Sequence, residues 1–176
     1  MSVIRMSFVR GDTKSHWCSG GPTTENAFTI RQARAGEFGA VLELLNESTL
    51  PEAGPAPHLA NLLVAADGDR IVGSAALEIY ADAALLRSVA VRQALRGRGL
   101  GVALTLAALD LARERGVRAV YLLTETAAEF FDRLGFRRIP RAEAEPAVGA
   151  SVEFTTACPA SATCMVLSLE PAASSA

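Results

Sequence analysis

Apolar residues recur along the chain with two different periods, and these periods predict alternating strands and helices. A spacing of three to four residues indicates an amphipathic helix, whereas alternation or a short continuous apolar run indicates a strand. Strands are expected over residues 28–31, 61–65, 70–80, 84–91, 117–123, 136–139 and 163–169, and helices over 36–46, 100–115 and 127–134. Prolines and a glycine between 51 and 57 favour a loop or a short second helix. This order of elements predicts an α/β fold, in which one mixed sheet carries helices on both faces.

Composition limits the remaining choices. At 176 residues, half of them apolar, the chain is long enough for one core, and a net charge of −2 disfavours a nucleic-acid partner. No apolar run approaches the ~20 residues of a membrane helix, so no membrane partner is expected, and three cysteines are too few for a disulfide scaffold. We expect a cytoplasmic protein, and the Arg- and Ala-rich composition is typical of a GC-rich bacterial source. Aperiodic, turn-forming sequence predicts flexible tails over 1–25 and 171–176 around a single domain over 26–170.

The segment 96–101, between a predicted strand and a predicted helix, contains three glycines and two arginines. Glycine lets the backbone approach a ligand closely, and the free N–H groups of a helix's first turn favour an anion. Arg96 and Arg98 add guanidinium groups that can bind phosphate oxygens. The segment therefore predicts a pyrophosphate cradle, and the alternative is a glycine-rich helix start that binds nothing.

Two common nucleotide-binding loops do not fit this segment. A Walker loop requires Gly-Lys-Ser/Thr, and the segment contains no lysine. A dinucleotide fingerprint requires a third glycine where Val102 stands, and it follows its strand directly, whereas residues 92–95 intervene here.

The glycine segment resembles the GNAT superfamily of acetyl-coenzyme A-dependent N-acetyltransferases. Arg96, Gly99 and Gly101 match the family's Arg/Gln-x-x-Gly-x-Gly/Ala pattern, and residues 127–136 resemble its short helix and Gly-Phe turn. The resemblance covers roughly residues 27–170. It implies the GNAT fold, in which a mostly antiparallel sheet has one splayed parallel strand pair, and acetyl-coenzyme A as co-substrate in the gap between those strands.

The resemblance also implies which residues hold acetyl-coenzyme A. Backbone groups of the strand expected over 84–91 face the pantetheine, the glycine segment holds the pyrophosphate, and Thr124 stands where many members have a pantetheine-binding Asn. The implied set is Val89, Ala90, Val91, Arg96, Gly97, Arg98, Gly99, Leu100, Gly101, Val102, Thr124 and Phe131. Phe131 takes the place of a tyrosine that acts as the general acid in many members, and phenylalanine cannot give a proton.

Two closer resemblances concern the acceptor. Residues 122–131 are similar to amino-acid acetyltransferases of the N-acetylglutamate synthase type, and segments 85–91 and 158–165 are similar to acetyltransferases found beside arsenic-resistance genes. They imply acetyl transfer by direct attack, in a ternary complex, to the amine of a small acceptor that is amino-acid-like or contains arsenic. Family members are often dimers, so a homodimer is an expectation by analogy alone.

Candidate catalytic and acceptor-binding residues lie on the strands around the expected gap. Glu78, between apolar neighbours, and Glu125, just past the fifth strand, are candidate general bases, although Glu78 fits an outward-facing position equally well. Arg87 with Ser88, and Arg31 as a lesser candidate, are the acceptor-binding candidates, since guanidinium can clamp an acid group. The alternative for Arg87 is a solvated face.

Cys158 and Cys164 support a different class of function, a non-catalytic coenzyme A-binding or arsenite-sensing protein, because thiolates bind soft ions. Two cysteines without a further Cys or His nearby do not make a closed metal site, so no metal is expected. Burial of at least one of the two in the last strand is the alternative to a ligand role.

Overall fold

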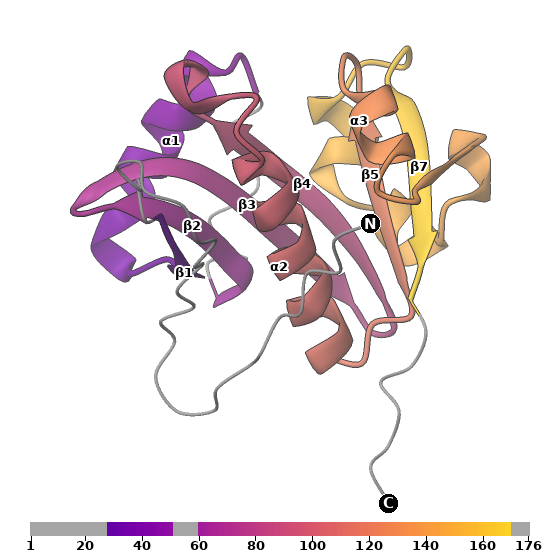
Figure 1. Cartoon of the computed structure of the whole chain (residues 1–176). Helices are drawn as coiled ribbons and strands as arrows, with labels where there is room; N and C mark the ends of the chain where they lie inside the picture. The colour runs from indigo at the N-terminus through magenta and orange to yellow at the C-terminus, as the bar shows by residue number, and fades with distance from the viewer. Residues whose placement is uncertain (1–27, 51–59, 170–176) are drawn as a thin grey trace, which may run out of the picture.

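The computed structural model describes residues 28–50 and 60–169, and they form a seven-stranded mixed sheet with the order β1-β2-β3-β4-β5-β7-β6 (Figure 1). Every neighbouring pair is antiparallel except β4 and β5, which are parallel. The predicted mixed sheet with one parallel pair is therefore confirmed. The strands are β1 Thr29–Gln32, β2 Leu62–Asp67, β3 Arg70–Tyr80, β4 Ala83–Val91, β5 Ala119–Thr124, β6 Arg137–Ile139 and β7 Thr163–Ser168.

The helices α1 Phe38–Glu47 and α2 Leu100–Glu114 pack on opposite faces of the sheet, as the sequence predicts. Leu104 and Ala108 of α2 are fully buried against β2, β3 and β4, and Val41 and Leu44 of α1 are fully buried on the other side of β2 and β3 (Figure 1). A Cβ on Gly73 would lie 2.7 Å from Leu104 Cδ1, so this glycine allows α2 to approach the sheet closely.

The expected strands and helices are all present, with ends shifted by at most two residues. Short elements between β6 and β7 were not expected from the sequence: a 3₁₀ turn at Arg141–Glu143, α4 at Pro146–Gly149 and a π-helical turn at Glu153–Ala157. Each is about one turn long, which is too short to show a period. The remaining elements are α3 at Ala128–Asp132 and 3₁₀ turns at Ala35–Glu37 and Gln93–Leu95.

Some sequence predictions lie outside the described residues: the tails over 1–25 and 171–176 and the loop between 51 and 57. No helix in residues 28–50 or 60–169 is long and apolar enough to cross a membrane.

Candidate active site

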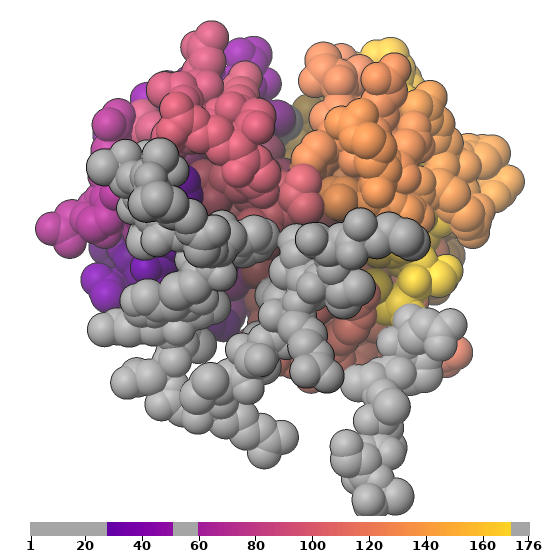
Figure 2. Space-filling model, in the orientation of Figure 1, coloured from indigo at the N-terminus to yellow at the C-terminus, as the bar shows by residue number. Residues whose placement is uncertain are grey.

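The parallel strands β4 and β5 pair over only three residues each, Ala83–Leu85 with Ala119–Tyr121. Beyond this point β4 remains paired with β3 as far as Val91, and β5 remains paired with β7 as far as Thr124. The two strands therefore diverge, and Figure 1 shows them meeting at one end and separating toward the other. Figure 2 shows the molecular surface hollowed between the two halves of the sheet at the separated end. The expected splayed pair is present, and its open end begins at Leu86.

A β-bulge interrupts β4 beside this opening. Ser74 on β3 pairs with Ala90, whereas Ala76 pairs with Arg87, so Ser88 and Val89 together face one residue of β3. Ser88 has φ +54°, a left-handed conformation that is rare for a residue with a side chain. Its carbonyl oxygen accepts a hydrogen bond from the buried Ser74 hydroxyl at 2.8 Å. The bulge therefore turns the backbone of Ser88 and Val89 away from the regular ladder at the edge of the gap.

The glycine segment leads from β4 into the first turn of α2. Gly97 has φ +76° and Gly99, the N-cap residue, has φ +80°, so both positions favour glycine. The first intrahelical bond runs from Ala103 N–H to the Gly99 carbonyl at 3.0 Å, which leaves the N–H groups of residues 100–102 pointing out of the helix end. These donors and the positive end of the helix dipole favour an anion beside the open end of β4.

The two arginines of this segment have different roles. Arg96 donates from Nε to the Val91 carbonyl at 3.0 Å and from Nη2 to Ser48 Oγ at 3.4 Å, so it braces the loop against α1. Arg98 is exposed and makes no hydrogen bond or ion pair with another described residue. Its guanidinium is thus available for a phosphate, whereas that of Arg96 is partly engaged.

The start of α3 lies across the gap, at the end of β5. Thr124 Oγ1 accepts a hydrogen bond from Ala127 N–H at 3.0 Å, which leaves the hydroxyl proton for a ligand. Phe131 is buried, with its ring edge-to-face against Phe130 at 4.9 Å and Phe136 at 5.5 Å between centroids. Phe131 is therefore a core residue of this wall, and it brings no proton donor to the gap.

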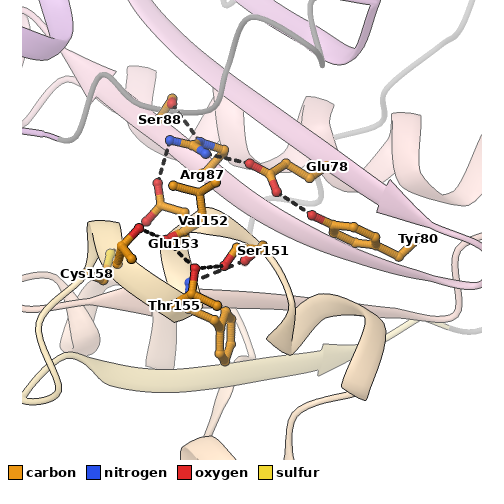
Figure 3. A network of polar contacts seen from close by, with 11 residues as sticks. Glu78, Tyr80, Arg87, Ser88, Ser151, Val152, Glu153, Thr155 and Cys158 are labelled. Carbon is orange, nitrogen blue, oxygen red and sulfur yellow. Dashed lines mark hydrogen bonds and ion pairs between the residues drawn. The ribbon is translucent and has the colours of Figure 1, made fainter.

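A buried network of charged side chains lies on the face of β3 and β4 opposite α2 (Figure 3). The Arg87 guanidinium pairs through Nη1 with Glu78 Oε1 at 2.5 Å and through Nη2 with Glu153 Oε1 at 2.7 Å. These three residues are only 4%, 2% and 6% exposed, so neither the solvated-face alternative for Arg87 nor the outward-facing one for Glu78 is correct. Tyr80 donates its hydroxyl proton to Glu78 Oε2 at 2.6 Å.

Because Glu78 already accepts hydrogen bonds from Arg87 and Tyr80, its carboxylate is poorly placed to accept a proton from an acceptor amine. Burial, reinforced by the hydrogen bond to Glu78, raises the pKa of Tyr80, so its hydroxyl stays protonated. The other candidate base, Glu125, is exposed and follows β5 directly at the open end of the strand pair.

The two cysteines lie in environments that disfavour the thiolate. Burial, followed by the hydrogen bond that its Sγ donates to Glu153 Oε2 at 2.7 Å, raises the pKa of Cys158 to about 12. Burial likewise raises the pKa of Cys164, which lies on β7 in the core. Both thiols are therefore neutral at pH 7, which counts against a thiolate site for a soft ion. No group of three or more metal-ligating side chains occurs among the residues that the structure describes.

Arg31 is not close to the gap. It lies on β1, at the edge of the sheet and three strands from β4, or about 14 Å at the usual strand spacing. Its guanidinium binds both oxygens of Glu37, at 2.6 and 2.7 Å. This pairing raises the pKa of Arg31, and the same hydrogen bond lowers the pKa of Glu37 to about 2. The acceptor-binding role expected for Arg31 is corrected to a brace between β1 and the turn before α1.

Sequence reasoning missed Ser74, Tyr80 and Glu153. Ser74 had a signal, since it is a polar residue within the otherwise apolar run 71–77. Glu153 had none, because it is 66 positions from Arg87 in the chain and belongs to an element too short to predict.

A mixed sheet whose parallel pair splays beside a glycine-rich helix start is the architecture of coenzyme A-dependent N-acetyltransferases, and the comparisons with known proteins agree. Residues 58–138 match the family model described as an acetyltransferase (GNAT) domain. This match spans 81 of the 176 residues, just under half of the chain, and it includes the glycine segment and both strands of the splayed pair, β4 and β5.

Among curated proteins, the chain is similar to N-alpha-acetyltransferase 30 of Schizosaccharomyces pombe, with 33% identity over 87 residues. The match covers 44% of this chain and 58% of the relative, so the chain spans just under three fifths of the curated relative that it matches.

Two solved structures to which the chain is similar were determined with bound ligands. Rv2747 from Mycobacterium tuberculosis, in complex with CoA and NLQ, has a TM-score of 0.65 and 25% identity over 81% of this chain and 99% of that one. N-acetylglutamate synthase from Neisseria gonorrhoeae, complexed with coenzyme A and N-acetyl-glutamate, has a TM-score of 0.71 and 21% identity over 84% of this chain and 36% of that one. The predicted GNAT fold and the likeness to N-acetylglutamate synthase are confirmed, and the association with arsenic resistance stays a prediction.

Proposed function

We propose that this protein transfers the acetyl group of acetyl-coenzyme A to the amine of a small acceptor. The observation that carries the proposal is the divergence of β4 and β5 directly beside the glycine segment. One end of the gap offers helix N–H groups for a diphosphate, and its wall offers the backbone of the Ser88 bulge for an acyl group.

The co-substrate would be held mainly by backbone groups. Residues Val89, Ala90 and Val91 would bond the pantetheine arm, because no described strand pairs with this edge of β4 beyond Leu85. The pyrophosphate would lie against the loop and the first turn of α2, where its backbone contacts would come from Gly97, Gly99, Leu100, Gly101 and Val102. Arg98 would supply the neutralising cation, and Arg96 would brace the loop. Thr124 would contribute its hydroxyl from the opposite wall, and Phe131 would contribute packing alone.

Acetyl transfer requires a neutral amine at the thioester carbonyl and donors for the oxyanion. We assign the base role to Glu125, which is exposed at the open end, rather than to Glu78, which is engaged by Arg87 and Tyr80. The acceptor nitrogen gives its proton to the base and forms the C–N bond as the C–S bond breaks. The departing thiolate then takes a proton from solvent or a nearby hydroxyl, since Phe131 supplies none.

Arg87 and Ser88 remain our candidates for contact with the acceptor. The guanidinium already holds the Glu153 carboxylate at 2.7 Å, so an acid group on the acceptor would have to replace Glu153 at that position. An amino-acid-like acceptor, including one that contains arsenic, has such a group beside its amine. The Glu153 pairing supports this class of acceptor, because it demonstrates that a carboxylate fits there.

A second candidate is acetylation of a peptide N-terminus. The 33% identity to an N-alpha-acetyltransferase over 87 residues favours it.

Thiol release from acetyl-coenzyme A, followed with a panel of amino acids, arsenic-containing amino acids and short peptides, tests the proposal. Turnover with a free amino acid supports a small acceptor, whereas turnover with peptides alone supports the second candidate. Calorimetry with coenzyme A provides the independent check, and absence of binding would overturn both. Glu125→Gln is expected to lower kcat at least tenfold without changing coenzyme A affinity.

A further inference from the structure

A left-handed residue lies inside the central sheet at the edge of the gap. Among the described residues, three that are not glycine have positive φ: Thr49, Ala81 and Ser88. Thr49 follows the end of α1 and Ala81 lies in the β3–β4 turn, and both are exposed, so local turn geometry accounts for them. Ser88 is only 9% exposed and lies within β4. A side chain in this conformation costs about 1–2 kcal/mol, so surrounding contacts must hold it.

The first such contact comes from Ser74. Its hydroxyl donates to the Ser88 carbonyl oxygen at 2.8 Å, and the residue is fully buried. Ser74 lies where the register of β3 and β4 shifts, so its side chain replaces a bond that the bulge removes from the backbone ladder. Without the hydroxyl, a buried carbonyl at the bulge would lose this partner.

The second contact is made by Arg87, the residue before Ser88. Arg87 Nε donates to Ser88 Oγ at 3.4 Å, while the same guanidinium is fixed by Glu78 and Glu153 (Figure 3). The side chain of Ser88 is thus held by Arg87 and its carbonyl by Ser74. The orientation of the peptide groups around Ser88 and Val89 depends on both contacts.

We infer that Ser74 is a positioning residue for acetyl transfer: by holding the Ser88 carbonyl, its hydroxyl aims the backbone N–H groups of the bulge at the acyl carbonyl. The inference rests on the proposed function. Ser74 itself touches neither substrate, and it acts through the Ser88 peptide. Loss of this hydroxyl therefore lowers the rate of the chemical step more than it lowers affinity for coenzyme A, because the glycine segment that binds the diphosphate is left intact.

The test compares Ser74→Thr with Ser74→Val. The two side chains have nearly the same shape and differ in the hydroxyl, so any overpacking in this buried position affects both. We expect Ser74→Val to have a kcat at least tenfold below that of Ser74→Thr, with calorimetric affinity for coenzyme A within threefold. Ser74→Ala should follow Ser74→Val. Val64→Ala, a buried change on β2 at the register partner of Ser74, controls for general destabilisation.

Equal kcat for Ser74→Thr and Ser74→Val would overturn the inference, as would a loss of kcat in Val64→Ala as large as that in Ser74→Val. A parallel loss of coenzyme A affinity in Ser74→Val alone would assign the hydroxyl to binding and also overturn it. If wild-type protein binds coenzyme A but turns over no amine, the proposed function fails, and this inference fails with it. If the wild-type protein turns over an amine and the kcat values of the Ser74 variants do not depend on the hydroxyl, only the role of Ser74 is refuted.

Discussion

Replacement of Arg87 by methionine tests whether the buried charge network stabilises the junction between the two halves of the sheet. Arg87→Met removes the cation that lies between the Glu78 and Glu153 carboxylates, each of which is more than nine-tenths buried. Breaking a buried ion pair by removing one partner costs about 3–5 kcal/mol, because a buried charge remains without compensation. Against a total stability of about 5–15 kcal/mol, this is a large fraction. We therefore expect Arg87→Met to lose at least 3 kcal/mol in urea unfolding followed by circular dichroism.

Two comparisons make this measurement specific to the network. Glu78→Gln/Arg87→Met/Glu153→Gln removes the charges together and should recover at least half of the loss, since the triple variant retains no buried carboxylate of the network. Arg113→Met breaks the exposed pair with Asp110 and should lose less than about 1 kcal/mol. A loss below 1 kcal/mol for Arg87→Met, or a triple variant less stable than Arg87→Met, would refute the reasoning.

Gly99→Val should weaken coenzyme A binding at least tenfold in calorimetry, because φ +80° is unfavourable for a β-branched residue. The control is Gly116→Val, at the other end of α2, which carries similar strain at φ +76° and should leave the affinity for coenzyme A unchanged. Since the pKa of Glu37 is lowered to about 2 from about 4.5, its stabilising effect is fully present above pH 4.5 and is lost as pH falls toward 2. The difference in unfolding free energy between wild type and Glu37→Gln should therefore shrink over that window. A constant difference would contradict the pairing with Arg31. Cys158, whose pKa is raised to about 12, should react with iodoacetamide at pH 8 at least 100-fold more slowly in the folded protein than in urea, as followed by peptide mapping; equal rates would show that the thiol is accessible and ionised.

Local patterns predicted most of the fold because its elements are long and their turns are encoded nearby. The Asp67–Asp69 turn predicts the β2–β3 hairpin, and the structure forms it with residues 68 and 69. The glycine segment was found in the same way, because the requirement for positive φ at Gly97 and Gly99 is a property of the residue type.

The contacts that define the site could not be predicted in this way. Whether Arg87 faces solvent or a buried partner depends on Glu153, which reaches it from the connection between β6 and β7. The bulge at Ser88 arises from a register shift between two strands and leaves no mark in either strand's period. The alternation of apolar residues predicts that β1 is a strand, but it does not contain the order of strands across the sheet. The expectation that Arg31 binds the acceptor fails for this reason, since β1 lies at the far edge.

The place of β7 in the sheet affects how the chain is assembled during synthesis. The last strand in sequence lies between β5 and β6, and β6 pairs with no other strand in the described part of the chain. A ribosome delivers residues from the N-terminus at about 5–20 per second, so β1 to β4 can form their hairpins before β7 is made. Until β7 is added, β5 is joined to the sheet only by its three residue pairs with β4. A chain that stops before Thr163 leaves both β5 and β6 with an open edge, and the gap between β4 and β5 then lacks a finished second wall.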